Sequence, residues 1–400
     1  MRIAIIDPYI RGIFGQRTHL RIAKILSKSN DVDFISYKVY EKLIDEVKNT
    51  VGKSNLTIVK KGYSSTYEFP YSLKYMYGGI VDLILSIEIK KRNKDKNYDA
   101  ILVISSSEGW WLGYFLKKIK KNGRPLICLH ITDPPTGIDL NFYEKGENTG
   151  FVKGIQDAFF LKFHKFRLKY FDIIFGQSEW TNNIFEKYFD IVPIGNAGGV
   201  DTDKFNPLHV TLATPDRYIV VPTVSLNDER KKIIRDLFNY GINMVLYGPN
   251  VVEGVPSQGY VSDEEMIRLI GNANAMLFLF DYESLGLIPL ESLSLGTPVI
   301  TEKKQGPFSE LKNNEYVKFI DNINDIEKIS KLCKEALIAT IDINYRMKIR
   351  SSVESYSFES FANRIINRID KSLLVMNSFS LIFNFLISKL MLLLCTTICS

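Results

Sequence analysis

The sequence has few cysteines and no paired cysteine motif. Its 400 residues include four of them, Cys128, Cys333, Cys395 and Cys399, and none lies at a spacing typical of metal ligands. We therefore expect no metal site built on cysteine, and a reducing compartment. We also expect no cleavable leader, because Met1 runs directly into an apolar segment.

Extreme charge is missing as well. The 51 Lys and Arg residues against 45 Asp and Glu residues give a net charge of +6. This excess is too small to indicate nucleic-acid binding, but it suits anionic small molecules or an anionic membrane surface. The dinucleotide-binding pattern G-x-G-x-x-G is absent, which argues against a dehydrogenase. No short repeat is visible, and the apolar content of 46% is that of a globular protein.

Short apolar runs alternate with helix-like segments along most of the chain, in two series. The first series of expected strands is Arg2–Ile6, Asp31–Ser36, Asn55–Val59, Tyr98–Ile104, Pro125–Ile131 and Asp172–Gln177. The second is Tyr218–Pro222, Asn243–Tyr247, Gln258–Val261, Ala275–Phe280, Thr297–Ile300 and Tyr316–Phe319. Such alternation predicts an α/β protein with two doubly wound parallel sheets, each binding ligands at the carboxyl ends of its strands.

The stretch Asp281–Ile300 carries the strongest functional signal. It follows the apolar run Ala275–Phe280, and its two glutamates, Glu283 and Glu291, are eight positions apart. A strand, a tight turn and a helix in this order expose backbone N–H groups at the mouth of a sheet, where the helix dipole favours a phosphate. On spacing alone, an ordinary loop with a solvated glutamate and a second glutamate on the helix surface is the better interpretation.

The residues around the two glutamates separate these interpretations. The run E-S-L-G-L-I-P-L-E-S-L-S-L-G-T-P-V-I resembles, almost position for position, the E-x7-E signature of retaining glycosyltransferases of the GT4 type, which have the GT-B fold. Gly199–Pro207 is similar to the family's G-V-D-x-x-x-F-x-P segment. Asp7–Arg17 is similar to its glycine-bearing first loop, although Phe14 precedes Gly15 where the family has adjacent glycines.

The resemblance spans residues 1–376 and implies two Rossmann-like domains facing a central cleft. An acceptor-side domain would occupy residues 1–198 and a nucleotide-sugar donor domain residues 199–355. A helix at 356–376 would return to the first domain, leaving an apolar tail at 377–400. The implied reaction moves a sugar from a nucleotide-diphosphate sugar to a hydroxyl of a glycan, lipid or protein, with retention of anomeric configuration and no metal.

The resemblance also assigns roles to residues. Glu291 would hold the ribose, and Glu283 would hold the transferred sugar. The backbone of Ser284, Leu285, Gly286 and Leu287 would meet the donor phosphates, together with the loop that contains Gly15. No covalent nucleophile is implied, because retaining enzymes of this type are usually described as reacting on one face of the sugar.

His130 ends the expected strand Pro125–Ile131, and the family often carries a histidine there. A neutral imidazole at a strand end could donate to a sugar hydroxyl or to charge near the anomeric carbon. The alternative is a core histidine bonded to backbone. His19, His164 and His209 have no such placement, and we expect them to be structural or exposed.

The donor side should also hold cations and an aromatic residue. The family places a basic pair after the first strand of the second domain, but its glycine-arginine is replaced here by Thr223-Val224. The pair is then drawn from Arg230, Lys231 and Lys232, unless these residues only form a solvated helix start. Tyr260, in a segment that resembles the base-binding one, packs either on the nucleotide base or in the core.

Two segments concern membranes. Phe159–Phe171 interleaves aromatic and basic residues, as in helices that lie on anionic bilayers, but a core helix with a solvated basic face has the same pattern. Leu373–Cys399 is long and apolar, although Asn384 and Lys389 interrupt it. The tail is a membrane anchor, an interfacial helix or a packing element. We expect a cytoplasmic protein, either free or held at the cytoplasmic face of a membrane.

Two alternatives remain beside the transferase. A sugar-nucleotide epimerase or a phosphorylase would share the fold, although an epimerase needs further acids and histidines in the cleft. A catalytically inactive sugar-binding or scaffold relative would explain the missing glycine-arginine.

Overall fold

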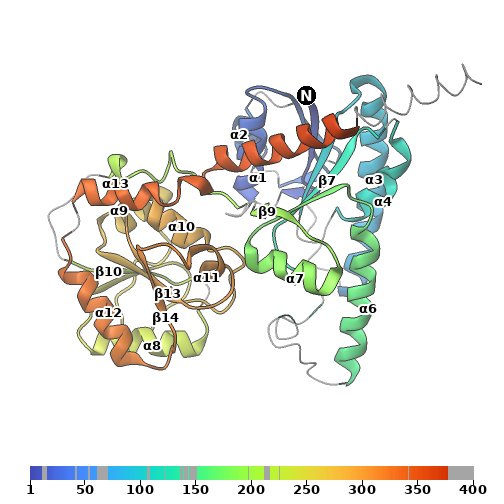
Figure 1. Cartoon of the computed structure of the whole chain (residues 1–400). Coiled ribbons are helices and arrows are strands. Elements are labelled where there is room, and N and C mark those ends of the chain that lie inside the picture. The colour runs from blue at the N-terminus through green and yellow to red at the C-terminus, as the bar shows by residue number, and fades with distance from the viewer. Residues whose placement is uncertain are drawn as a thin grey trace, which may run out of the picture.

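The computed structural model describes residues 1–10, 16–40, 43–52, 55–60, 71–105, 109–121, 123–135, 138, 143, 151–196, 198–210, 217–224, 226–340 and 342–376. Gly15 and the tail 377–400 therefore lie outside the described residues. Two lobes make up the molecule, and a long helix near the C-terminus crosses from one to the other (Figure 1).

The first lobe is built on a seven-stranded sheet with the order β5-β3-β1-β6-β7-β8-β9, in which every pair is parallel. Its strands are β1 (Arg2–Ile6), β3 (Asp31–Ser36), β5 (Asn55–Ile58), β6 (Ala100–Ser105), β7 (Leu126–Ile131), β8 (Ile173–Gly176) and β9 (Ile194–Asn196). A small parallel pair, β2 (Tyr9–Ile10) and β4 (Lys38–Val39), lies beside it. The strand order reverses at β1, so the carboxyl ends of β1 and β6 form a binding edge.

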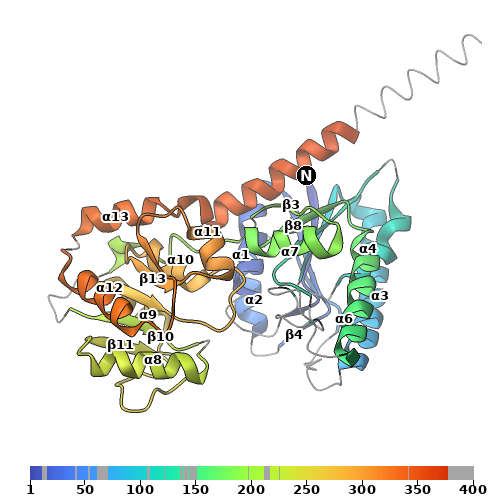
Figure 2. The ribbon, with the colours of Figure 1, turned by 60° about the horizontal axis from the view of Figure 1, so that its bottom comes forward.

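Helices cover both faces of this sheet, because consecutive parallel strands must be joined by crossover connections, which are usually helices. They are α1 (Gln16–Leu26), α2 (Ile44–Thr50), α3 (Tyr71–Lys96), α4 (Trp111–Leu116), α6 (Phe151–Leu168) and α7 (Glu179–Phe189), with the short helix η3 (Lys117–Ile119) after α4. Residues alternate along β7, so Cys128 packs on the α1 side and Leu129 on the α3 side. Figure 2 shows α3, α4 and α6 together on one side of the lobe.

The second lobe has a five-stranded parallel sheet with the order β11-β10-β12-β13-β14. Its strands are β10 (Ile219–Pro222), β11 (Met244–Tyr247), β12 (Ala275–Phe278), β13 (Val299–Glu302) and β14 (Val317–Ile320). Its helices are α8 (Asp228–Asn239), α9 (Asp263–Asn272), α10 (Leu287–Ser294), α11 (Gln305–Leu311), α12 (Ile326–Ile338) and α13 (Ile343–Ser351), with η4 (Pro207–His209) and η5 (Glu354–Tyr356). Two parallel α/β sheets confirm the predicted fold class.

The helix at 358–376 returns to the first lobe, also as predicted. Phe361, Ile365, Ile369 and Leu373, spaced four residues apart, are buried in the core on the α1 side of the first sheet. This spacing is that of one helix face. Among the helices of the described residues, none combines the length and the apolar content that crossing a membrane requires.

One expected strand is wrong. Residues 258–261 form no strand, and this loop touches the sheet only through a single bridge between Leu246 and Ser257. Gly259 has φ +66°, and its carbonyl accepts the N–H of Gly248 at 2.8 Å. The left-handed glycine turns the chain away from the sheet, which a strand would not allow. Directly after this loop, Ser262 caps α9 and accepts the N–H of Glu265 at 3.2 Å.

Candidate active site

The loop between β12 and α10 is the centre of the site. It ends at Gly286, the N-cap of α10, whose φ of +96° lies in the left-handed region that favours glycine. The Oε1 atom of Glu283 accepts the N–H groups of Leu285 at 3.3 Å and of Gly286 at 3.1 Å. Glu283 therefore holds, with its own carboxylate, two of the backbone donors that the sequence offered to a phosphate.

The neighbouring loop after β13 fixes Glu283 from behind. The N–H of Glu283 donates to Oε1 of Gln305 at 2.7 Å, and its carbonyl accepts the N–H of Gly306 at 3.2 Å. Gly306 packs against the carbonyl of Ser284 with no room for a Cβ. The two loops thus form one rigid unit at the carboxyl edge of the second sheet.

Glu291 lies just over a turn into α10 and faces a small polar cluster. Burial raises its pKa to about 8; Lys204 opposes this shift, while Asp263 and Glu283 add to it. Lys204 itself donates to Asp263 at 2.6 Å. The buried Tyr247, at the end of β11, has its pKa raised by burial and by Glu291, and its hydroxyl has no hydrogen-bond partner among the described residues. A hydroxyl-bearing ligand at this point would meet an acceptor and a donor.

The first lobe contributes an acid to the same place. Asp133 follows β7, and burial raises its pKa, while hydrogen bonds from Ser284 and Tyr282 act in the opposite direction. The pKa of Glu283 is also raised, first by burial and in part by Asp133. Ser178, the N-cap of α7, donates to the carbonyl of Ser284 at 2.6 Å. The two lobes therefore meet directly at the Tyr282–Ser284 loop.

A second interlobe contact lies beside this one. The N–H of Glu179 donates to Oε1 of Glu310 at 2.5 Å, and the N–H of Trp180 donates to Oγ of Ser309 at 3.2 Å. Side chains of α11 in one lobe thus satisfy the first amides of α7 in the other, which are unpaired within their own helix. Lys312 adds an ion pair to Glu179 at 2.9 Å.

His130 lies at the end of β7, buried against Phe361 of the returning helix, with 5.0 Å between ring centroids. Burial, and secondarily His19, lowers the pKa of His130 to about 3, so its ring is neutral. Neither ring nitrogen has a hydrogen-bond partner in the described part of the chain. His19, which we expected to be structural or exposed, is buried beside it and pairs with Asp7 at 3.0 Å.

The three predicted basic residues differ in their surroundings. Arg230 is buried and forms a two-pronged pair with Glu302, with N–O distances of 3.0 Å and 2.8 Å. It also pairs with Glu229 at 3.2 Å and with Asp281 at 3.6 Å. Lys231 pairs with Asp228 on the surface of α8 at 3.4 Å. Lys232 is exposed and has no ion pair among the described residues.

Tyr260 is 81% exposed, which excludes a core role. Two further exposed apolar side chains, Val224 and Val251, follow β10 and β11, and Asn250 ties these loops together by donating to the carbonyl of Thr223. An aromatic face in solvent near two strand ends suits stacking on a planar ligand.

Sequence reasoning missed Asp7, His19, Asp133 and Tyr282. The first three follow or face predicted strand ends in the first lobe, so their position along a strand was a usable signal. Tyr282 carried none, because its role depends on the approach of the other lobe. The described residues contain no group of three or more metal-ligating His, Cys, Asp or Glu side chains.

Comparisons with known proteins match this geometry. Residues 251–353 match the family model described as "Glycosyl transferases group 1". No curated protein sequence matches the chain. Solved structures do. A glycosyltransferase from Rickettsia africae shares 14% identity at a TM-score of 0.65, covering 93% of this chain and 98% of that one.

Two further solved structures agree over nearly their full length. Sucrose-phosphate synthase from Thermosynechococcus elongatus has 14% identity and a TM-score of 0.66, covering 94% of this chain and 99% of that one. Anabaena HepE in complex with UDP has 11% identity and a TM-score of 0.62, covering 93% and 100%. The chain has the GT-B fold.

Within this GT-B fold, the matched segment 251–353 contains Glu283, Glu291 and the loop that supports them. It contains neither His130 nor Arg230. Both glutamates therefore lie inside the matched segment, whereas His130 and Arg230 lie outside it.

Proposed function

We propose that this protein is a retaining glycosyltransferase of the GT4 type, which moves a sugar from a nucleotide-diphosphate sugar to an acceptor hydroxyl. The observation that carries the proposal is the convergence of Glu283, Glu291 and Asp133 where the two lobes meet. Nucleotide binding is supported by the exposed Tyr260 and by Glu291 beside Tyr247, an arrangement suited to a base followed by a ribose.

In the proposed complex, the donor diphosphate takes the N–H groups of Leu285 and Gly286 at the start of α10. These donors are held by Glu283 in the present structure. Binding of the donor would therefore release the Glu283 carboxylate, which then accepts hydrogen bonds from the transferred sugar. The same carboxylate would thus keep the site ordered before the donor binds and position the sugar afterwards.

His130 and Asp133 would act from the acceptor side. A neutral His130 has one ring N–H, which can donate a hydrogen bond to a sugar hydroxyl or to charge near the anomeric carbon, and the ring need not first lose a proton. Asp133 already touches the loop that carries Glu283, so it would align the acceptor hydroxyl against the donor. We assign no covalent nucleophile, and the leaving phosphate would accept the acceptor's proton.

Metal is not required in this proposal, because helix α10 and the cations at 230–232 would neutralise the leaving diphosphate. We expect turnover to survive EDTA, measured as release of nucleoside diphosphate from the donor. Loss of turnover with EDTA and its recovery with Mg²⁺ or Mn²⁺ would contradict this prediction.

The direct test is the nucleotide affinity of Glu291→Ala. A lost hydrogen bond to a charged group costs about 1.5–3 kcal/mol, so at about pH 9, where Glu291 is ionised, we expect roughly 10- to 100-fold weaker binding of the preferred nucleoside diphosphate. The preferred nucleotide is first found by thermal shift, since a bound ligand stabilises the native state. Glu327→Ala, on the outer helix α12, serves as the matched control. Unchanged affinity in a folded Glu291→Ala protein would remove Glu291 from the donor site.

An inactive binding protein is the second candidate, favoured by the engagement of Arg230 with Glu302, Glu229 and Asp281. Purified protein that binds the nucleotide but neither hydrolyses the donor nor transfers its sugar would support it. Conversion of the donor to an epimer would indicate the remaining alternative.

A further inference from the structure

A cluster of aromatic and basic side chains covers the outer side of the first lobe. We call it the α4–α6 face and define it by Trp111, Tyr114, Lys117, Phe166, Lys169 and Tyr170. Trp111 and Tyr114 of α4 lie 6.1 Å and 6.2 Å from the ring of Phe166 on α6, and Tyr114 lies 5.1 Å from Tyr170. Phe166 is 41% exposed. Trp111, Tyr114 and Tyr170 are half-buried, so the aromatic layer is open to solvent mainly at Phe166.

The lysines of this face sit on its rings rather than against acids. Lys117 lies 4.0 Å from the ring centroid of Tyr114 and 4.7 Å from that of Tyr170. Lys169 lies 4.4 Å from the ring of Phe166 and 5.0 Å from that of Tyr170. Neither lysine forms an ion pair within the described ranges of the chain, so their charges remain available to an anionic surface.

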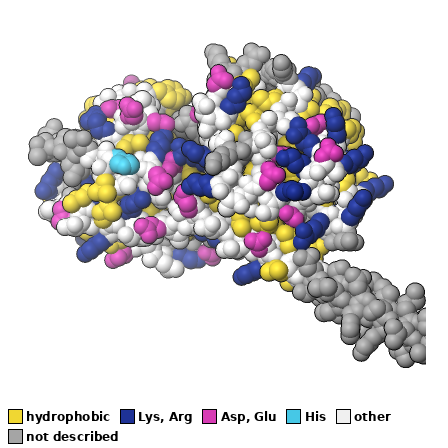
Figure 3. Space-filling model, turned by 90° about the horizontal axis from the view of Figure 1, so that it is seen from above, with side chains coloured by type: hydrophobic (Ala, Val, Ile, Leu, Met, Phe, Trp, Pro, Cys, Tyr) yellow, Lys and Arg dark blue, Asp and Glu magenta, His cyan; other side chains and the backbone are white. Residues whose placement is uncertain are grey.

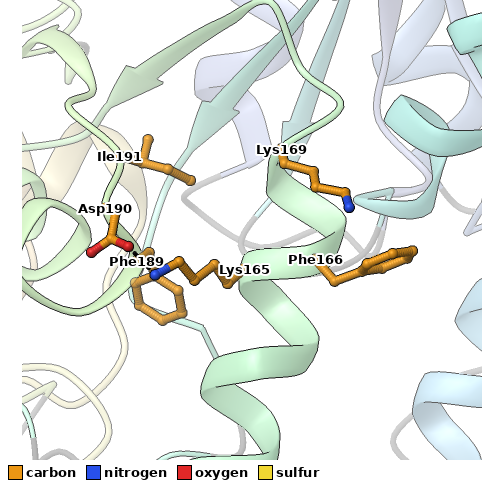
Figure 4. Close-up of a pocket in the computed structure, with 6 residues that line it drawn as sticks. All are labelled: Lys165, Phe166, Lys169, Phe189, Asp190 and Ile191. Carbon is orange, nitrogen blue, oxygen red and sulfur yellow. Dashed lines mark hydrogen bonds and ion pairs between the residues drawn. The ribbon is translucent and has the colours of Figure 1, made fainter.

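Lys165, on the same helix, differs from Lys169 because it forms an ion pair. Lys165 pairs with Asp190 beside a cavity of about 430 Å³ between α6 and the end of α7, and Phe166 and Lys169 also line this cavity. Figure 4 shows Lys165 directed toward Asp190, whereas Phe166 and Lys169 leave the helix on the opposite side. The only acid of α6 is Asp157, which is buried, so the exposed charges of this helix are all positive.

The apolar surface extends beyond the face itself. Phe159 and Ile155 on α6 and Ile80, Leu83 and Ile87 on α3 are exposed, although such side chains are usually covered in a soluble monomer. Seen from above, basic side chains gather with hydrophobic ones on the outer side of this lobe (Figure 3).

The end of the returning helix lies close to the same surface. Met376 packs directly over Gly123, which leaves no room for a Cβ there. Gly123 follows η3 and the exposed Lys117, Lys118 and Lys121, which also lack ion pairs in the part of the structure that is described. The strongly apolar sequence 377–400 therefore starts beside a basic segment that continues α4.

We propose that the α4–α6 face docks on an anionic lipid bilayer. Aromatic side chains favour the boundary between headgroups and acyl chains, and lysines beside them attract anionic headgroups. Docking does not depend on the proposed transfer reaction.

The test is sedimentation of the full chain with vesicles of phosphatidylcholine, with and without phosphatidylglycerol. Lys117→Glu/Lys169→Glu is compared with Lys331→Glu/Lys334→Glu, which makes the same change of charge on the exposed side of α12. Phe166→Ala tests the aromatic part. Thermal melting and nucleotide binding confirm that each variant is folded.

We expect the wild-type chain to bind phosphatidylglycerol vesicles in preference to neutral ones, and high salt to release it. Each lysine near an anionic membrane surface raises the binding constant about fivefold. Lys117→Glu/Lys169→Glu should therefore bind the vesicles at least about 20-fold more weakly, while Lys331→Glu/Lys334→Glu should bind nearly as the wild type does. Equal binding by the two charge variants, or equal binding of the wild type to both kinds of vesicle, would overturn the proposal. Equal binding by the two charge variants is the result expected if the apolar sequence 377–400 alone attaches the protein.

Discussion

His130 has surroundings that separate a core role from a role in the cleft. Both of its ring nitrogens are buried without partners in the described residues. Unpaired buried polar atoms cost free energy, so we expect His130→Leu to leave the free energy of unfolding unchanged or to raise it by about 1 kcal/mol. If a nitrogen donates to the substrate, the transfer rate should fall roughly a hundredfold.

Urea unfolding and initial transfer rates measure the two effects separately. Nucleotide affinity should not change, because His130 lies in the acceptor-side lobe, and it serves as the internal control. A His130→Leu protein with a normal rate would show that the histidine only fills the core beside Phe361.

Glu291 predicts a dependence of stability on pH. Its pKa is about 8 in the folded chain and about 4.3 in an unfolded one, so the folded state binds more protons between these values. The free energy of unfolding should therefore fall as pH rises through this window and level off above it. The variant Glu291→Gln has no titratable group at this position, so it should not show this loss of stability with pH. The side chain is only partly buried, which reduces the effect. Between about pH 5 and about pH 9, the free energy of unfolding of Glu291→Gln should therefore rise by roughly 1–3 kcal/mol relative to that of the wild type.

Urea midpoints at the two pH values give this difference directly. The Glu327→Ala protein, altered on an exposed helix, should follow the wild-type curve. Parallel curves for Glu291→Gln and the wild type would mean that Glu291 ionises normally in the folded protein.

Helix α8 is tied to strand β13 by the buried pair of Arg230 and Glu302. Glu302 also accepts the N–H of Phe280 at 2.9 Å, so the pair anchors the start of the donor loop. Removing one partner leaves a buried charge, and we expect Arg230→Ala to cost about 3–5 kcal/mol of stability. Lys232 lies two residues further along α8, on its exposed side, so Lys232→Ala should change the free energy of unfolding by less than about 0.5 kcal/mol.

Nucleotide affinity then decides which residue meets the diphosphate. Arg230→Ala/Glu302→Ala removes both charges and should recover part of the lost stability. If this folded double variant still binds nucleotide normally, Arg230 has a structural role, and Lys231 or Lys232 becomes the candidate. A stable Arg230→Ala protein would contradict the buried pair itself.

We expect the two lobes and the returning helix to fold without residues 377–400. The core of the first lobe includes Phe361, Ile365, Ile369 and Leu373, so the helix at 358–376 closes it. Deleting residues 377–400 should therefore shift the melting temperature by less than about 2 °C, as seen in a thermal scan. Deleting residues 358–400 instead exposes this apolar stripe and should cause aggregation. A tail-deleted protein that unfolds would show that the tail packs on the body.

Much of this architecture was predictable from local patterns. Alternating apolar runs predicted both parallel sheets, because fully buried strands need continuous apolar sequence. Ser262 marks the start of α9 in the sequence, because serine is one of the residue types favoured at a helix N-cap. The loop at 258–261 was mistaken for a strand because its composition is strand-like, while the left-handed Gly259 that bends it has no marker in the sequence pattern.

The sequence by itself determined the two-domain α/β fold, the helix that returns to the first lobe, and the glutamates of the donor loop. The α/β fold follows from the periodicity of the sequence, whereas the returning helix and the two glutamates were expected because their segments resemble those of a known family. Only the tertiary structure decided that Arg230 is paired with Glu302, that Glu283 holds the amides of Gly286, and that Asp133 meets Ser284 across the lobes. Such contacts join residues 3 to 151 positions apart, so their charge balance and burial depend on how the elements pack.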